Sequence, residues 1–205
     1  MLAGAFVLPT LEIEGESCLS TNRFAPAASE SLNQKVNAMK TITLEQAKRW
    51  CIEAHGDQTY GSHPYEFHLD RVAEVAVRFG FGDDQTLMKC YGHDVIEDTD
   101  KTEDDMRDAG FPEDVVEDVS LVSDEEGATR KERKEKTLVK IATKRSAILL
   151  KLCDRIANVE HSKKTKNEKK FSMYQEEYAD FEAALRDRND KGLEALWQHL
   201  EGLFA

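Results

Sequence analysis

Apolar side chains recur every three to four positions through most of this chain, which is the spacing of one face of a helix. Thr43 can cap such a helix, and it is followed at this spacing by Ala47, Trp50, Cys51 and Ala54. The same period predicts helices over residues 65–79, 85–98, 130–141, 145–159 and 174–185, and a last one that ends with Leu193, Leu196, Trp197 and Leu200. No alternation of apolar and polar residues persists, so we expect an all-α fold.

Two shorter helices are predicted from the residues at their ends. Thr102 followed by Asp105 resembles a capping box, and the helix that it opens should stop at Gly110. Pro112 stands where a first helical residue is expected, ahead of valines at helical spacing over residues 115–122. The chain is therefore expected to consist of many helices joined by short loops.

The first 40 residues do not share this period. A short apolar run from Leu2 to Leu8 is stopped by Pro9, and the rest is rich in Ser, Ala and Asn. A signal peptide would need a basic start and a longer apolar stretch, and neither is present. We expect a poorly ordered, irregular leader over residues 1–40 and one helical domain over residues 41–205.

Charge and composition narrow the possible partners. The 205 residues include 28 Lys and Arg against 40 Asp and Glu, a formal net charge of −12 that would repel a nucleic-acid backbone or an anionic membrane. No stretch approaches the roughly 18 apolar residues of a membrane span. The four cysteines are far apart with no CxxC pair, which suits a reducing cytosol rather than a disulfide framework. We expect a cytoplasmic protein that binds neither nucleic acid nor membrane, and the oligomeric state stays open.

The segment YGHDVIEDT, residues 91–99, carries the densest polar chemistry. In a continuous helix its polar side chains would share about one side, because they are three or four residues apart: His93, Asp94, Glu97 and Asp98. Ionisable groups beside core residues are costly unless something compensates their charge. A bound cation is the obvious compensation.

Partners for a metal site are found on two other predicted helices. His68 lies among apolar residues near a helix start, and Asp154 lies in the most apolar helix of the chain. Taken singly, His68 is an ordinary core or helix-end histidine, and Asp154 is an ion-pair partner of Arg155 or Lys151. Taken with the 91–99 segment, two imidazoles and two carboxylates suit Mn²⁺, Fe²⁺, Co²⁺ or Zn²⁺.

Three segments together resemble a known family. PYEFHLDRVAEVA (64–76), GHDVIEDTDKTEDDM (92–106) and LLKLCDRIANVEHS (149–162) are similar in order and spacing to the HD-domain hydrolases of the Rel/SpoT type, and most like the small stand-alone alarmone hydrolases of the metazoan SpoT-homologue kind. The resemblance covers about residues 54–162. It implies a single HD-type helical bundle, one Mn²⁺ ion, and removal of the 3′-pyrophosphate from guanosine tetra- and pentaphosphate.

The resemblance also implies roles for individual residues. The metal ligands would be His68, His93, Asp94 and Asp154. Glu97 and Asp98 would stand beside the attacking water and the substrate as catalytic residues, and Asn158 would contact the nucleotide. Lys151 is a further candidate for phosphate contact because of its place in the same helix, as is Lys144 shortly before it.

One departure from the family pattern bears on the substrate. Relatives carry a basic pair shortly before the PYxxH segment, whereas residues 58–63 here contain neither Arg nor Lys. Tyr60 or His63 would have to hold a base by stacking instead, or be plain loop residues. The basic stretch 163–170 lies at the rim of the site or forms a solvated loop.

Three functions therefore remain open. The first is a metal-dependent pyrophosphohydrolase of alarmone-like, small phosphorylated nucleotides. The second keeps the metal site but acts as a phosphatase on another nucleotide, which the missing basic pair favours. The third is a non-catalytic nucleotide sensor or antitoxin-like partner, which a degenerate site would favour.

Overall fold

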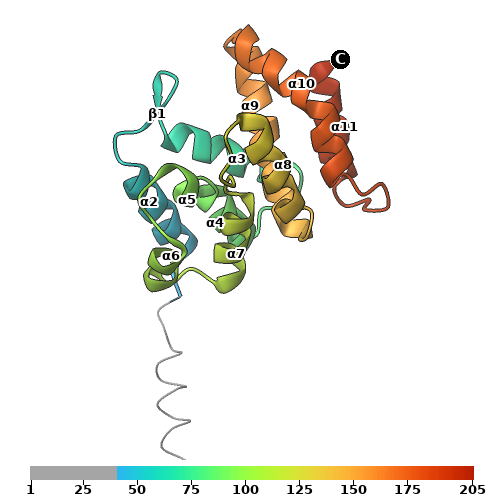
Figure 1. The fold of residues 1–205 in the computed structure, drawn as a ribbon. Helices are drawn as coiled ribbons and strands as arrows, with labels where there is room; N and C mark the ends of the chain where they lie inside the picture. Colours follow the sequence, from blue (N-terminus) through green and yellow to red (C-terminus); the bar gives the residue numbers. More distant parts are fainter. Residues whose placement is uncertain (1–40) are drawn as a thin grey trace, which may run out of the picture. The chain divides into compact units, whose positions relative to one another are not determined.

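The computed structural model describes residues 41–205, and the leader expected over residues 1–40 lies outside them. The described chain is almost entirely helical, which confirms the all-α prediction (Figure 1). The helices are α2 (Leu44–His55), α3 (Glu66–Arg78), α4 (Asp84–Gly92), α5 (Val95–Asp98), α6 (Glu103–Ala109), α7 (Glu113–Val122), α8 (Arg130–Ile141), α9 (Arg145–Lys164), α10 (Glu168–Leu185) and α11 (Glu194–Phe204). None of these helices is long and apolar enough to cross a membrane.

The caps predicted from the sequence form as expected. The Thr102 hydroxyl accepts from the backbone N–H of Asp105, and the Asp105 carboxylate accepts from the backbone N–H of Thr102, which completes a capping box at the start of α6. Gly110 ends that helix at φ 96°, a left-handed conformation that favours glycine. Thr43 forms a second box with Gln46 at the start of α2.

The prediction of one continuous helix over residues 85–98 was wrong. The structure has two helices there, α4 and α5, which are separated by His93 and Asp94. The carbonyl of Cys90, which would accept from Asp94 in an unbroken helix, lies 2.8 Å from Nδ1 of His93. Gly92 lets this end of α4 approach α7, since a Cβ there would meet Cγ2 of Val119 at 3.2 Å.

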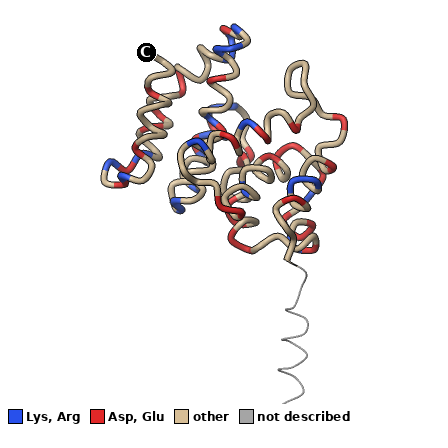
Figure 2. Tube along the Cα trace, turned by 180° about the vertical axis from the view of Figure 1, so that it is seen from behind, with Lys and Arg blue, Asp and Glu red and all other residues tan. Residues whose placement is uncertain are grey.

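Two other features differ from the prediction. A small antiparallel hairpin joins β1 (Thr59–Tyr60) to β2 (His63–Pro64), with a turn at Gly61 that has φ 64°. The basic stretch 163–170 is mostly helix rather than loop, because α9 runs to Lys164 and α10 begins at Glu168. Figure 2 shows the basic residues of this turn as one of several blue segments among the acidic ones.

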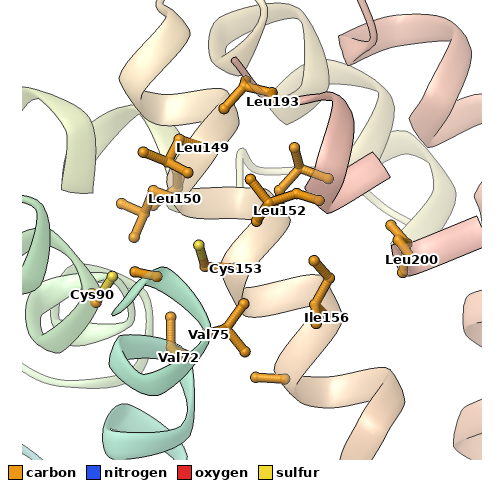
Figure 3. Close-up of a cluster of buried hydrophobic side chains, with 14 of the residues drawn as sticks. Val72, Val75, Cys90, Leu149, Leu150, Leu152, Cys153, Ile156, Leu193 and Leu200 are labelled. Carbon is orange, nitrogen blue, oxygen red and sulfur yellow. The ribbon is translucent and has the colours of Figure 1, made fainter. Parts of the chain in front are cut away.

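Helix α9 is the centre of the fold. It contacts α3, α4, α7, α8, α10 and α11, and its side chains are buried from Leu149 to Ala157. Figure 3 shows its residues Leu152, Cys153 and Ile156 lying between α3 and the carboxyl-terminal part of the chain. Because all sides of α9 are covered, a polar residue on this helix is also buried. Asp154 is in that position, 9% exposed.

A second core lies among α2, α4, α6 and α7, and a largely buried ion-pair network joins α4 to α7. The Asp118 carboxylate of α7 is fully buried, and its two oxygens each lie 2.8 Å from an ammonium group, one of Lys89 and one of Lys144. Lys89 on α4 is itself buried. These pairs connect α4, α7 and the residue before α9, so they fix the helices that carry the polar segment 91–99.

We predict that Asp118→Ala lowers the free energy of unfolding by about 3 kcal/mol, because the buried ammonium of Lys89 then keeps only the half-exposed Asp114 as a counter-charge. Glu117→Ala is the matched control. Glu117 is adjacent to Asp118 on α7, and its carboxylate lies 2.6 Å from the ammonium of Lys144. Because the Glu117 side chain is more than half exposed, its loss should lower the free energy of unfolding by about 1 kcal/mol or less. Urea denaturation of both variants measures the difference, and equal losses would contradict this account of the network.

Candidate metal centre

Three separate parts of the chain bring the predicted metal ligands together. His68 comes from α3, His93 and Asp94 from the break between α4 and α5, and Asp154 from α9. The Nε2 atoms of His68 and His93 lie 3.1 Å apart. Oδ2 of Asp94 lies 2.9 Å from Nε2 of His93 and 3.4 Å from Nε2 of His68.

Asp154, which lies on α9, is the fourth member of the group. Its Oδ1 lies 3.4 Å from Nε2 of His68 and 3.7 Å from Nε2 of His93. Ligand atoms bound to one ion at about 2.0–2.2 Å lie about 3–3.5 Å from one another, so the separations among His68, His93 and Asp94 fit a single divalent ion, and Asp154 lies beside these three residues. Two imidazole nitrogens and two carboxylate oxygens suit Mn²⁺ and the neighbouring transition metals.

The second nitrogen of His93 supports the same interpretation. Its Nδ1 lies 2.8 Å from the carbonyl oxygen of Cys90, which can only accept, so Nδ1 carries the proton and donates. That arrangement leaves the lone pair of Nε2 facing His68 and Asp94, as in a metal-bound histidine. The helix break described above therefore orients a candidate ligand.

The electrostatics of the cluster favour a positive charge among the carboxylates. Burial would raise the pKa of Asp94, but His93 and His68 hold it well below its usual range. Burial would likewise raise the pKa of Asp154, but Lys151 and His68 lower it. Burial would lower the pKa of His68, yet hydrogen bonds to Asp154 and Asp94 raise it to about 9. A cation in contact with both carboxylates supplies the same compensation.

Tyr65 links the metal cluster to Asp98, a connection that the sequence analysis did not foresee. Its hydroxyl lies 2.6 Å from Oδ2 of Asp94 and 2.9 Å from Oδ2 of Asp98. The Tyr65 ring stacks on His55 at 4.2 Å between centroids, and Gln58 donates to the carbonyl of Asp98. The only sequence signal for this role was the position of Tyr65 in the PYxxH segment.

Tyr60 and Asn158, both expected to contact substrate, form contacts with the candidate ligands. The Tyr60 hydroxyl donates to Oδ1 of Asn158 at 2.7 Å, and Asn158 donates to both the carbonyl and the carboxylate of Asp154. The Tyr60 ring stacks on His68 at 4.6 Å, and the ammonium of Lys170 lies 5.2 Å from its centroid. The ring of Tyr60 therefore already contacts His68 and Lys170. Both Tyr60 and Asn158 line the pocket.

A pocket of about 300 Å³ opens onto the cluster. Basic side chains form much of its wall: Arg130, Lys134, Lys151, Arg155 and Lys170. Lys151 was expected here. Arg130 and Lys134 were not among the expected residues, yet their four-residue spacing on α8 places both in the wall. Lys144 lies elsewhere, paired with Asp114, Glu117 and Asp118.

The two predicted catalytic carboxylates have different surroundings. Glu97 lines the pocket and accepts from the backbone N–H of Asp124 at 3.2 Å. Part of Glu97 is exposed to solvent. The surrounding protein removes enough water from its carboxylate to raise the pKa, although the positive charges of Lys151 and Lys134 act in the opposite direction. Asp98 is absent from the pocket lining and contacts Tyr65 instead. Glu97 is therefore the carboxylate that can meet a ligand directly.

Comparison with known proteins places the fold. No protein-family model matches the chain. Among solved structures, the chain is similar to a protein described as a metazoan ortholog of SpoT that hydrolyzes ppGpp and plays a role in starvation responses. The TM-score is 0.59 and the sequence identity 21%, over 80% of this chain and 98% of that chain. The two proteins share a fold.

We predict that Tyr65→Phe weakens divalent-metal binding by about 10–100-fold, because Asp94, a candidate ligand, loses the hydrogen bond that orients it. Tyr91→Phe is the matched control, since it removes a 3.2 Å hydrogen bond to Asp70 outside the cluster. Metal affinity measured by competition with a chelator tests both variants. Equal affinity of Tyr65→Phe and the parent would remove Tyr65 from the metal centre.

Proposed function

We propose that this chain is a metal-dependent pyrophosphohydrolase of small phosphorylated nucleotides, with guanosine tetra- and pentaphosphate as the first substrates and the 3′-pyrophosphate as the group removed. The observation that carries the proposal is the cluster of His68, His93 and Asp94 at ligand spacing, with Asp154 beside it, at a pocket whose wall holds five basic side chains. The fold shared with a ppGpp hydrolase supports the same chemistry.

The proposed ion is Mn²⁺, held by His68, His93, Asp94 and Asp154. When bound, such an ion lowers the pKa of water toward about 7 and stabilises negative charge that develops on a phosphoryl group. The four ligands orient this charge toward the pocket, and the surrounding core excludes other water from their side of the cluster.

Glu97 is proposed as the residue that orients the attacking water and accepts its proton. It lines the pocket, and its raised pKa brings the carboxylate closer to the value that favours proton transfer near neutral pH. Asp98 is proposed to act through Tyr65, whose hydroxyl connects it to the ligand Asp94. Glu97 would therefore contact the attacking water, whereas Asp98 would help to hold Asp94 in place through Tyr65.

The basic wall favours a diphosphate over a single phosphate. Arg130 and Arg155 offer planar guanidinium groups that match phosphate oxygens, while Lys134, Lys151 and Lys170 add point charges. The five cations outnumber the three carboxylates of the same wall, Asp94, Glu97 and Asp154, so a ligand with more than one negative charge is favoured. Asn158 lines the same pocket and is proposed to contact the nucleotide, as are Tyr60 at its hydroxyl and Lys151.

A second candidate is a phosphatase that acts on another nucleotide at the same metal site. It is favoured by residues 58–63, where a hairpin without Arg or Lys stands in place of the basic pair of relatives. The non-catalytic sensor is less favoured, because every expected ligand type is present at ligand spacing.

The deciding experiment compares the parent with Asp94→Ala, Glu97→Gln and Asp98→Asn. Asp94→Ala should lose both divalent metal and turnover while its helical circular dichroism stays near that of the parent. Glu97→Gln and Asp98→Asn should each keep bound metal and lose at least about 10²-fold in turnover, the low end of general acid–base catalysis. Metal content and the released product are measured with and without Mn²⁺.

Three outcomes would count against the proposal. Turnover that survives EDTA in a metal-free parent would exclude the metal-dependent mechanism. Full activity of both acidic variants would remove Glu97 and Asp98 from it. Release of orthophosphate alone, from nucleotides other than the guanosine alarmones, would favour the second candidate.

A further inference from the structure

A second cavity lies beside the catalytic pocket, between α8, α9 and α10. Its volume is about 350 Å³, against about 300 Å³ for the catalytic pocket. The side chains that belong to the walls of both are all basic: Arg130, Lys134, Lys151 and Arg155. We call this second space the α8–α10 cavity.

The inner wall of the α8–α10 cavity combines apolar groups with buried cations. Leu138 and Ile141 of α8 and Phe181 of α10 provide the apolar surface. Lys151 and Arg155 of α9 are each 7% exposed. Cavities of this size with mostly apolar walls and a few polar groups are the usual binding sites of small molecules.

Arg155 has few partners for a buried guanidinium. The group lies 4.8 Å from the ring centroid of Tyr174 and 4.7 Å from that of Phe181. Its Nη1 donates to Glu177 at 2.9 Å. A guanidinium has five N–H donors, and the described residues accept from this one alone. The remaining donors border the two cavities.

The ammonium of Lys151 also has few close hydrogen-bond or ion-pair partners. Its ammonium lies 3.4 Å from the carbonyl of Val122 and 3.5 Å from Oδ2 of Asp154, both long contacts. Glu176 and Asp180 are exposed to solvent, which screens their charge. The remaining donors of Lys151 and Arg155 are not sealed inside the protein, so an anion that enters the cavity can pair with them.

We propose that the α8–α10 cavity binds a flat apolar molecule that carries an anionic group, and that its occupancy weakens binding of an anion in the catalytic pocket. The apolar body would lie on Leu138, Ile141 and Phe181, and the anionic group would contact Arg155. The first part depends only on the cavity. The second part rests on the proposed function, because it takes the substrate to be a phosphorylated anion.

The coupling follows from residues that both cavities share. Glu177 accepts from Nε of Arg130 at 2.7 Å and from Nη1 of Arg155 at 2.9 Å, so one carboxylate holds both guanidinium groups. An anion in either cavity draws on the same cations and leaves fewer for the other. Coupling between two binding sites is reciprocal, so each ligand must weaken the other by the same factor.

The test uses the Mn²⁺-loaded protein, anilinonaphthalene sulfonate as an apolar anionic probe, and inorganic pyrophosphate as the ligand of the catalytic pocket. Leu138→Trp fills the cavity, whereas Val139→Trp adds the same bulk at the next position of α8, where the side chain is 72% exposed. Titration calorimetry should show about one probe bound, with affinity reduced about tenfold or more in Leu138→Trp and unchanged in Val139→Trp. Circular dichroism checks that both variants are folded.

Pyrophosphate should lower the affinity for the probe by about 5-fold or more, and the probe should lower the affinity for pyrophosphate by the same factor. Equal probe affinity in both tryptophan variants would overturn the site and leave the proposed function standing. Probe binding that pyrophosphate does not change would overturn the coupling. A protein that releases no phosphate or pyrophosphate from any nucleotide, yet binds the probe as expected, would overturn the proposed function while supporting the cavity.

Discussion

The structure depends on the cost of placing two carboxylates inside a helical core. Asp154 lies on the most enclosed helix, and Asp94 lies where α4 ends against α7. An isolated ionised group in such a place costs far more free energy than one domain has to spare. The fold meets this cost by placing His68, His93 and Lys151 around the two carboxylates. The arrangement of α3, α4, α5 and α9 follows from the need to keep these groups in contact.

The surroundings of the cluster show the same constraint one step further out. Tyr60 and Asn158 form a chain of hydrogen bonds that ends on Asp154, and Tyr65 does the same for Asp94. Each carboxylate is therefore oriented by a neutral donor as well as by an imidazole. Such outer partners restrict side-chain rotation, which keeps a binding site preformed rather than assembled on demand.

The sequence was sufficient for what depends on local pattern and on charge in apolar surroundings. Helical period predicted the fold class, caps predicted the ends of α6, and the polar residues of apolar segments predicted four candidate ligands that the structure brings close together. The sequence was insufficient where tertiary contacts decide. The break at His93 depends on a side chain that bonds the carbonyl of Cys90. The role of Arg130 depends on which face of α8 is covered, and alternating charges along a helix leave that undecided.

The proposed ligands come from parts of the chain that are far apart, with His68 on α3 and Asp154 on α9. An unfolded chain has no such cluster, so a metal ion that binds here binds only the folded state. Binding of this kind adds to the free energy of unfolding in proportion to the logarithm of the metal concentration above its dissociation constant. The amount of folded protein in a cell would then follow the supply of the metal, and a shortage would remove the chain itself along with its chemistry.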